Sequence, residues 1–163
     1  MHAHDLAWRR LLPALAGATT ICTTIDIERD AADVFAFVST PAQWHLWHPA
    51  TRAVREVPDR PLVAGETMLE SIRAAGRSFD ALWTVLACDA PTRWVIATDT
   101  PRGVARITYR ITAGAGRCRF ERTLEFRSKG RWWSGLDGTL TRWILVRQSA
   151  RALRNLQRVL EST

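Results

Sequence analysis

Hydrophobic positions follow two different periods along the chain, and each period predicts one kind of element. From Ile21 to Ile27 apolar and polar residues alternate, which predicts a half-buried strand. Residues 31–38 and 41–48 are instead crowded with apolar side chains. Asp30 can cap the first of these segments, while Pro41 can begin the second and Pro49 stops it. The pattern therefore predicts one strand followed by two short helices.

A series of alternating segments follows, and turn residues separate its members. A short edge strand is expected near 52–57, and longer strands at 66–73, 77–88, 94–98, 105–111 and 118–126. A two-residue turn at 75–76 sets the register of the first long pair and predicts three opposite pairs: Met68 with Trp83, Glu70 with Ala81, and Ile72 with Phe79. Such alternation is typical of an antiparallel meander with one solvated face and one covered face.

The last segment, from about 140 to 160, has the period of a helix. One stripe of it is apolar or small, with Leu145, Ser149, Ala152, Leu156 and Val159. The concave face of a twisted sheet is the only large apolar surface that this helix can cover. The predicted fold is thus α+β, a curved antiparallel sheet of about seven strands wrapped around a long C-terminal helix. A lipocalin-like closed barrel is the alternative, although it has no use for two short helices after strand one.

The composition suits one globular domain, because 163 residues of which 47% are hydrophobic can bury a sizeable core. We divide the chain into an N-terminal helical extension, 1–19, and a single ligand-binding domain, 20–163. The extension is expected to be helical because four apolar residues share a helix face: Trp8, Leu11, Leu12 and Leu15. A secretory signal peptide is the alternative, since two arginines precede the apolar segment and small residues at 16–18 resemble a cleavage site.

The chain has a formal charge of +7, from 23 basic and 16 acidic residues. A positive field attracts nucleic acid, anionic lipid or acidic small molecules, and the charge alone does not choose among them. We interpret it first as a solvated surface and expect no nucleic-acid partner. The three cysteines are far apart, so we expect reduced, mostly buried thiols and a cytoplasmic rather than a secreted or periplasmic location.

The order of elements, together with the segments at 34–38 and 41–49, Gly65-Glu66 and Trp83-Thr84-Val85, resembles the START and polyketide-cyclase (SRPBCC) superfamily. This superfamily includes birch-pollen-allergen-like proteins, and the resemblance covers the chain from about Thr20 onward. It implies the helix-grip fold, with the tryptophans after the first helix packing the small helices onto the sheet. Members resembling this chain hold lipids, polyketides, sterols or other apolar molecules between sheet and helix, and some catalyse cyclisation or dehydration there.

The covered face of the predicted sheet supplies the candidate ligand site. Its wall consists of Met68, Glu70, Ile72, Trp83, Trp94, Ile96, Ile107, Tyr109, Phe120 and Arg122 from the strands, with Leu145, Ser149 and Ala152 from the helix. These side chains suit a flat or aromatic ligand. A filled core is the alternative, but Ser149 and Ala152 are small where a filled core favours leucine. The sequence therefore predicts a ligand-sized cavity.

Two ionisable residues, Glu70 and Arg122, interrupt the otherwise apolar columns, and each is costly if buried without a partner. In the functional interpretation, Arg122 holds a carboxylate, phenolate or enolate of the ligand, Tyr109 is a second donor and Glu70 an acid or base. In the structural interpretation, the two charges form a buried ion pair or extend to water at the rim. Arg122, Tyr109 and Glu70 are the candidate catalytic residues.

Other motifs limit the chemistry. His45 and His48 are spaced i, i+3 but lack a nearby third ligand, so we expect no metal site. The sequence has no GxSxG motif, no phosphate-binding glycine loop and no recognisable nucleophile pair, so we expect no cofactor, and hydrolase chemistry is disfavoured. Trp132 and Trp133 stand beside cations and either make a peripheral membrane contact, act as a lid or pack over the helix start.

These observations leave three classes of function. The favoured one is binding of a small apolar or aromatic ligand, lipid-like or polyketide-like, in a cavity between the sheet and the C-terminal helix. The second is a cyclase, aromatase or dehydratase that acts on a polyketide-like carbonyl compound. The third is an interaction protein that works through an arginine-rich face: Arg147, Arg151, Arg154 and Arg158.

Overall fold

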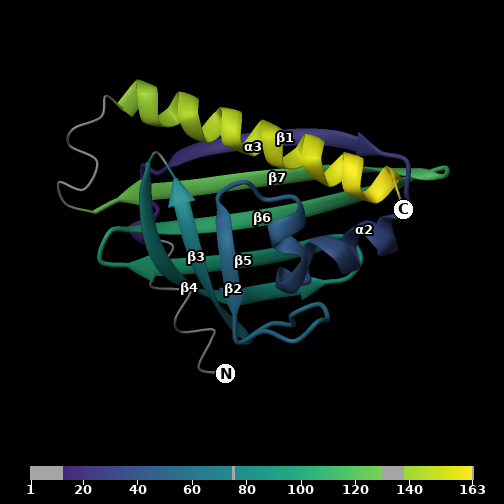
Figure 1. The fold of residues 1–163 in the computed structure, drawn as a ribbon, viewed down its shortest axis with the longest axis horizontal. Helices are drawn as coiled ribbons and strands as arrows, with labels where there is room; N and C mark the ends of the chain where they lie inside the picture. The colour runs from purple at the N-terminus through teal and green to yellow at the C-terminus, as the bar shows by residue number, and fades with distance from the viewer. Residues whose placement is uncertain (1–12, 75, 130–137, 163) are drawn as a thin grey trace.

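The computed structural model describes residues 13–74, 76–129 and 138–162, and its seven strands form one antiparallel sheet in the order β1-β7-β6-β5-β4-β3-β2 (Figure 1). The strands are β1 (Thr19–Ile27), β2 (Thr51–Arg55), β3 (Thr67–Ala74), β4 (Arg77–Asp89), β5 (Arg93–Thr100), β6 (Gly103–Gly114) and β7 (Arg117–Ser128). Two short helices, α2 (Ala31–Val38) and the 3-10 helix η1 (Pro41–Leu46), follow β1, and α3 (Gly138–Glu161) crosses the sheet. The predicted helix-grip fold is confirmed. The closed barrel is wrong, because β1 and β2 are the edges of the sheet.

The register of the first long hairpin is the predicted one. Its opposite pairs are Met68 with Trp83, Glu70 with Ala81, and Ile72 with Phe79. The same alternation holds in β7, where Phe120 and Arg122 are buried and Arg119 is exposed. Period-2 patterning thus determines which side chains enter the space between the sheet and α3.

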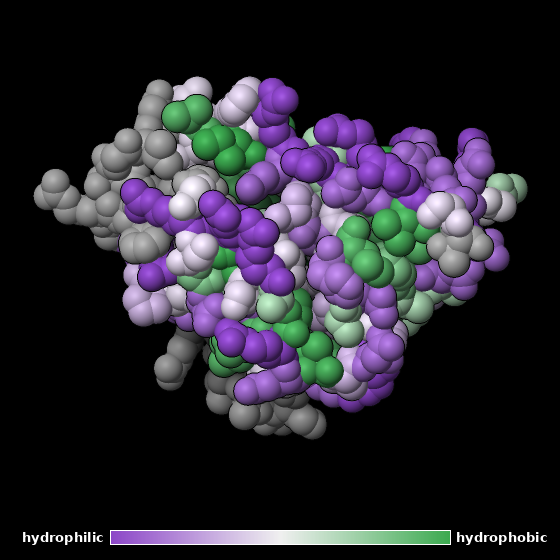
Figure 2. Space-filling view, in the orientation of Figure 1, coloured by the Kyte–Doolittle hydropathy of each residue, from purple (hydrophilic) through white to green (hydrophobic). Residues whose placement is uncertain are grey.

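Helix α3 buries one stripe and exposes the other. Ser149, Ala152 and Leu156 are buried as predicted, whereas Val159 is only partly buried and Leu153 and Leu160 join the buried side. The buried stripe packs against β1 and η1. Hydrophilic side chains line much of the outer side of α3 (Figure 2).

The short helices depend on packing more than on capping. Asp30 occupies the position before α2, but its side chain makes no capping hydrogen bond, contrary to the prediction. Three apolar residues of α2 are buried instead: Val34, Phe35 and Val38. Trp44 of η1 donates a hydrogen bond from Nε1 to the carbonyl oxygen of Val38 at 2.9 Å, which fixes η1 against α2.

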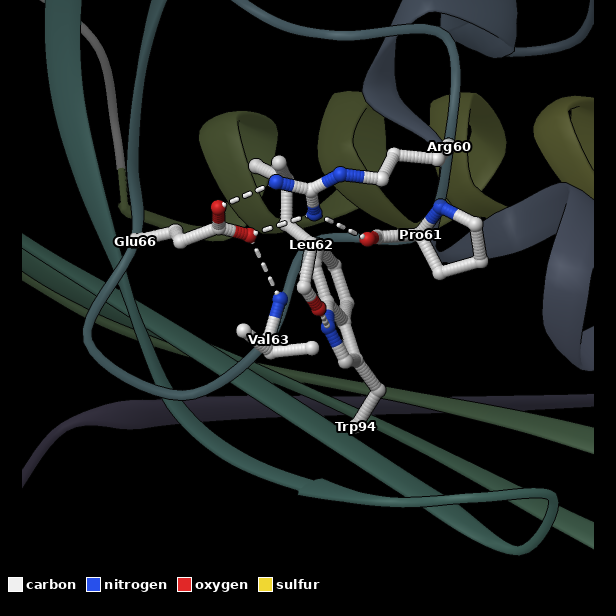
Figure 3. Close-up of polar contacts among 6 residues, drawn as sticks. All are labelled: Arg60, Pro61, Leu62, Val63, Glu66 and Trp94. Atoms are coloured by element: carbon white, nitrogen blue, oxygen red, sulfur yellow. Dashed lines mark hydrogen bonds and ion pairs between the residues drawn. The ribbon is translucent and has the colours of Figure 1, made fainter.

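The loop between β2 and β3 lies over the buried indole of Trp94 (Figure 3). Arg60 donates hydrogen bonds to both carboxylate oxygens of Glu66, at 2.7 and 2.9 Å, and these contacts lower the pKa of Glu66 to about 2. The carbonyl oxygen of Leu62 accepts a hydrogen bond from Trp94 Nε1 at 2.9 Å. The loop therefore satisfies a buried donor that the sheet alone leaves unpaired.

The cysteines differ from the expectation. Cys118 is buried, Cys88 is partly buried and Cys22 is exposed, and all three are free thiols. Cys22 is exposed because it lies one residue from Ile21 on β1, and adjacent residues of a strand point to opposite faces. The prediction of mostly buried thiols was wrong for this residue.

Two predictions concern segments that lie partly or wholly outside the described residues. Leu15 is buried, but Trp8, Leu11 and Leu12 of the predicted N-terminal helix lie outside the described residues, so the division at residue 19 stays a prediction. Trp132 and Trp133 also lie outside them. Within the described ranges, no helix has the length and apolar composition needed to cross a bilayer.

Candidate functional site

A cavity of about 150 Å³ lies between the sheet and the first half of α3. Seven of the residues proposed from sequence line it: Glu70, Ile72, Trp83, Ile107, Arg122, Leu145 and Ser149. Apolar residues of the same strand faces complete much of the wall, among them Phe79, Ala81, Ala105, Leu124 and Phe126. The alternation of side chains along each strand thus indicates these wall residues, because each of them lies on the same face of its strand as a residue predicted to line the cavity.

The other six predicted residues do not line the cavity. Met68, Trp94, Ile96, Tyr109, Phe120 and Ala152 are packed in the core, each no more than 1% exposed. Two tryptophans at the end of η1 cover this part of the sheet. The Trp47 ring lies 6.1 Å from that of Tyr109 and 6.4 Å from that of Phe120, and Trp44 meets Trp94 edge to face at 6.1 Å. These two indoles confine the cavity to the opposite part of the sheet.

The cavity reaches the surface where β6 begins and β7 ends. Arg127 and Ser128, which line it there, are exposed. Arg102 places its guanidinium over the ring of Phe79, 5.6 Å from the centroid. An apolar interior with cations at its opening suits a ligand that has an apolar body.

Glu70 is a buried carboxyl on the cavity wall. Its Oε1 accepts a hydrogen bond from Thr51 Oγ1 at 2.5 Å, and its Oε2 accepts one from Trp83 Nε1 at 2.8 Å. Burial raises the pKa of Glu70 to about 7, although both hydrogen bonds oppose the rise. The group can therefore either give or accept a proton near neutral pH.

His48 connects Thr51 to the guanidinium of Arg122. Its Nδ1 lies 3.1 Å from Thr51 Oγ1, and its Nε2 lies 3.2 Å from Arg122 Nη2. A guanidinium can only donate, so Nε2 accepts and the neutral imidazole carries its proton on Nδ1. Burial lowers the pKa of His48 well below its ordinary value, and the positive charge of Arg122 adds to this effect.

Arg122 is a buried cation whose hydrogen-bond partners are neutral. It is 3% exposed, and its Nη1 donates a hydrogen bond to Ser149 Oγ at 2.9 Å. Among the described residues its Nε has no partner, and no carboxylate lies within ion-pair distance of it. Within the described residues, Arg122 thus forms no direct ion pair with Glu70 and does not extend to water, and its partners are the neutral Ser149 and His48.

Tyr109 lies opposite Arg122 in the register of β6 and β7. Its ring stacks on Trp94 at 5.6 Å, and its buried hydroxyl has no hydrogen-bond partner within the described part of the chain. Burial raises the pKa of Tyr109 to about 12, against the positive charge of Arg122, so the phenol stays protonated at neutral pH and can both donate and accept a hydrogen bond. The structure places the three candidate catalytic residues in one region, with Tyr109 outside the cavity wall.

Sequence reasoning missed two members of this network. In the sequence, the spacing of His48 from His45 suggests only a metal ligand, but His45 is exposed and its Nδ1 contacts the carbonyl oxygen of Ala42. Thr51 begins the short edge strand β2, and a threonine there carries no signal in the sequence. The described residues contain no cluster of three potential metal ligands.

Comparison with known proteins identifies the family to which the chain belongs. The protein family described as polyketide cyclase / dehydrase and lipid transport matches residues 18–161. The chain belongs to this family. No curated protein matches the chain at a significant level.

Solved structures that resemble this family member share its fold at low sequence identity. A START superfamily protein from Mycobacterium smegmatis has a TM-score of 0.72 and 12% identity, with 88% of this chain and 97% of that chain covered. The Zhui aromatase/cyclase from a Streptomyces species has a TM-score of 0.72 and 13% identity, covering 88% and 94%. A Thalictrum norcoclaurine synthase point mutant, in complex with a transition-state analogue, has a TM-score of 0.62 and 11% identity, covering 89% and 95%.

Proposed function

We propose that this polyketide cyclase / dehydrase family member binds a small apolar or aromatic molecule that carries an anionic or enolisable oxygen. The apolar body occupies the cavity, and the oxygen accepts hydrogen bonds from Arg122. The observation that carries the proposal is the buried guanidinium on the cavity wall, which has an unpartnered Nε and no carboxylate within ion-pair distance among the described residues. A buried charge without a counter-charge is expensive, and a ligand anion supplies one.

The size of the cavity limits the ligand. An apolar cavity of roughly 150 Å³ holds a molecule of about the size of benzene. The cavity here has a volume of about 150 Å³ and opens at Arg127 and Ser128, so a second ring or a short chain can extend outward. A compact aromatic acid or phenol therefore fits better than a long lipid.

A second candidate function is catalysis, and Glu70 supports it. Its carboxylate lines the same cavity as Arg122 and has a pKa of about 7. As a general base it would take a proton from the carbon beside a ligand carbonyl, and the electron pair of the broken C–H bond would move onto the carbonyl oxygen. Arg122 would stabilise the resulting enolate, which is the first step of a cyclisation or dehydration.

Isothermal titration calorimetry with 2-naphthoate and its neutral counterpart 2-naphthamide tests the binding function. We expect the wild type to bind 2-naphthoate roughly 10-fold or more tightly than the amide, because a hydrogen bond to a charged group contributes about 1.5–3 kcal/mol. Burial of the rings gives binding a negative heat-capacity change. The variant Ala105→Leu fills part of the cavity and should fold but bind neither compound. Equal affinity for the two compounds, or undiminished binding by Ala105→Leu, would contradict the proposal.

A further inference from the structure

An arginine-lined hollow lies on the surface beside the cavity. It measures about 550 Å³ and contains five arginines from three elements: Arg52 of β2, Arg73 of β3, and Arg147, Arg151 and Arg154 of α3. Trp143 lines it as well, and none of the described residues that line it is acidic. We call this surface, together with the adjoining Leu140 of α3, the arginine face.

Among the described residues, the arginines of this face have no carboxylate partner, unlike several arginines elsewhere on the protein. Five other arginines each form an ion pair with a carboxylate: Arg55, Arg60, Arg93, Arg106 and Arg119. Within the described ranges, none of the five at the hollow forms an ion pair, and all five are exposed. Their positive charges are therefore available to an external anion.

Exposed apolar side chains accompany these charges. Trp143 is 54% exposed and Leu140 44% exposed, and the guanidinium of Arg147 lies 4.7 Å from the Trp143 ring centroid. Leu140, Trp143, Arg147, Arg151 and Arg154 follow one another at intervals of three or four residues, so they share one side of α3. Figure 2 shows hydrophobic side chains near the start of α3 and hydrophilic ones along its continuation.

The arginine face adjoins the ligand cavity. Pro49 and Gln148 line both hollows, so these two side chains form a shared wall. A molecule held at the arginines therefore lies next to the inner cavity.

We propose that the arginine face docks the protein on an anionic phospholipid bilayer. Arginines take the lipid phosphates, and Trp143 and Leu140 enter the boundary between head groups and acyl chains, where tryptophan is favoured. A nucleic acid also attracts arginines, but binding to its phosphates does not explain the exposed leucine beside them. The apolar residues on the same side of α3 therefore favour the bilayer.

Co-sedimentation with vesicles tests this proposal, using phosphatidylcholine alone or mixed with phosphatidylglycerol. The wild type should bind the mixed vesicles and lose binding in moderate salt. R147Q/R151Q should bind about 30-fold more weakly, since each arginine near an anionic surface contributes about 1 kcal/mol. R110Q/R117Q removes the same charge from exposed positions on β6 and β7 and should bind nearly as well as the wild type.

A second pair of variants tests the apolar contact. W143A should weaken vesicle binding, whereas L82A, which truncates a side chain 55% exposed on β4, should not. Thermal denaturation checks that every variant is folded. Equal weakening by both arginine pairs, or equal binding to both vesicle types, would overturn the proposal. So would a single-stranded RNA that binds more tightly than vesicles and depends on Arg147 and Arg151, or displacement from vesicles by free glycerol phosphate.

Discussion

Replacing Arg122 with methionine is expected to leave the protein at least as stable as the wild type and to abolish its preference for an anionic ligand. The guanidinium is buried with neutral acceptors only, Ser149 Oγ and His48 Nε2. Methionine removes a desolvation penalty of several kcal/mol, which offsets the loss of two hydrogen bonds. The affinity for 2-naphthoate should fall about 10- to 100-fold, and the affinity for 2-naphthamide should change little.

Urea denaturation and calorimetry on the same samples measure both effects. Arg119→Met is the matched control, because Arg119 lies on the same strand but is exposed and forms an ion pair with Asp26. This control should leave the affinity for 2-naphthoate unchanged. A loss of more than about 3 kcal/mol of stability in Arg122→Met, with equal effects on both ligands, would assign Arg122 a structural role instead.

Replacing Glu70 with glutamine is expected to remove the loss of stability that the wild type shows as the pH rises toward 8. The pKa of Glu70 rises from its ordinary 4.5 to about 7 in the folded protein. Between these values the folded protein holds a proton that the unfolded chain releases, so the stability falls as the pH rises. At about 1.4 kcal/mol per pKa unit, the ionised carboxyl costs about 3 kcal/mol above pH 7. Glutamine cannot ionise and avoids this cost.

The difference in the free energy of unfolding between Glu70→Gln and the wild type isolates the contribution of the Glu70 carboxyl. His48 is neutral when folded and destabilises both proteins as the pH falls below about 6.5, so its contribution largely cancels. The free energy of unfolding of Glu70→Gln minus that of the wild type should rise by about 3 kcal/mol between pH 4.5 and 8.

Urea denaturation across this pH range measures the difference. Glu66→Gln is the control. The pKa of Glu66 is lowered to about 2, so its contribution to stability is lost only as the pH falls below 4.5, and its difference curve should be flat from pH 4.5 to 8. A flat curve for Glu70→Gln would show that the Glu70 carboxyl has an ordinary pKa.

Periodicity was enough to predict the sheet and both buried charges. Alternation places Glu70 and Arg122 on the covered face, and a charge among apolar residues is visible without a structure. Their partners were not predictable in the same way. His48 and Thr51 reach Arg122 and Glu70 through the packing of η1 and the start of β2, which no residue period encodes.

The extent of the cavity could not be predicted from the sequence pattern either. Parity assigns Trp94, Tyr109 and Phe120 to the covered face but does not tell which part of that face remains open. The rings of Trp44 and Trp47 decide this, because they pack against these three aromatics. A tryptophan in a short 3-10 helix has no fixed direction relative to a sheet until the tertiary structure forms.

Native mass spectrometry of the protein purified from its own host tests the central claim most directly. Wild-type protein should carry a small molecule that is released on denaturation and that contains an aromatic or unsaturated body with an acidic oxygen. Arg122→Met and Ala105→Leu, purified in the same way, should lack it. Wild-type protein that is empty in every preparation, or one that carries the same molecule as Arg122→Met, would contradict the account.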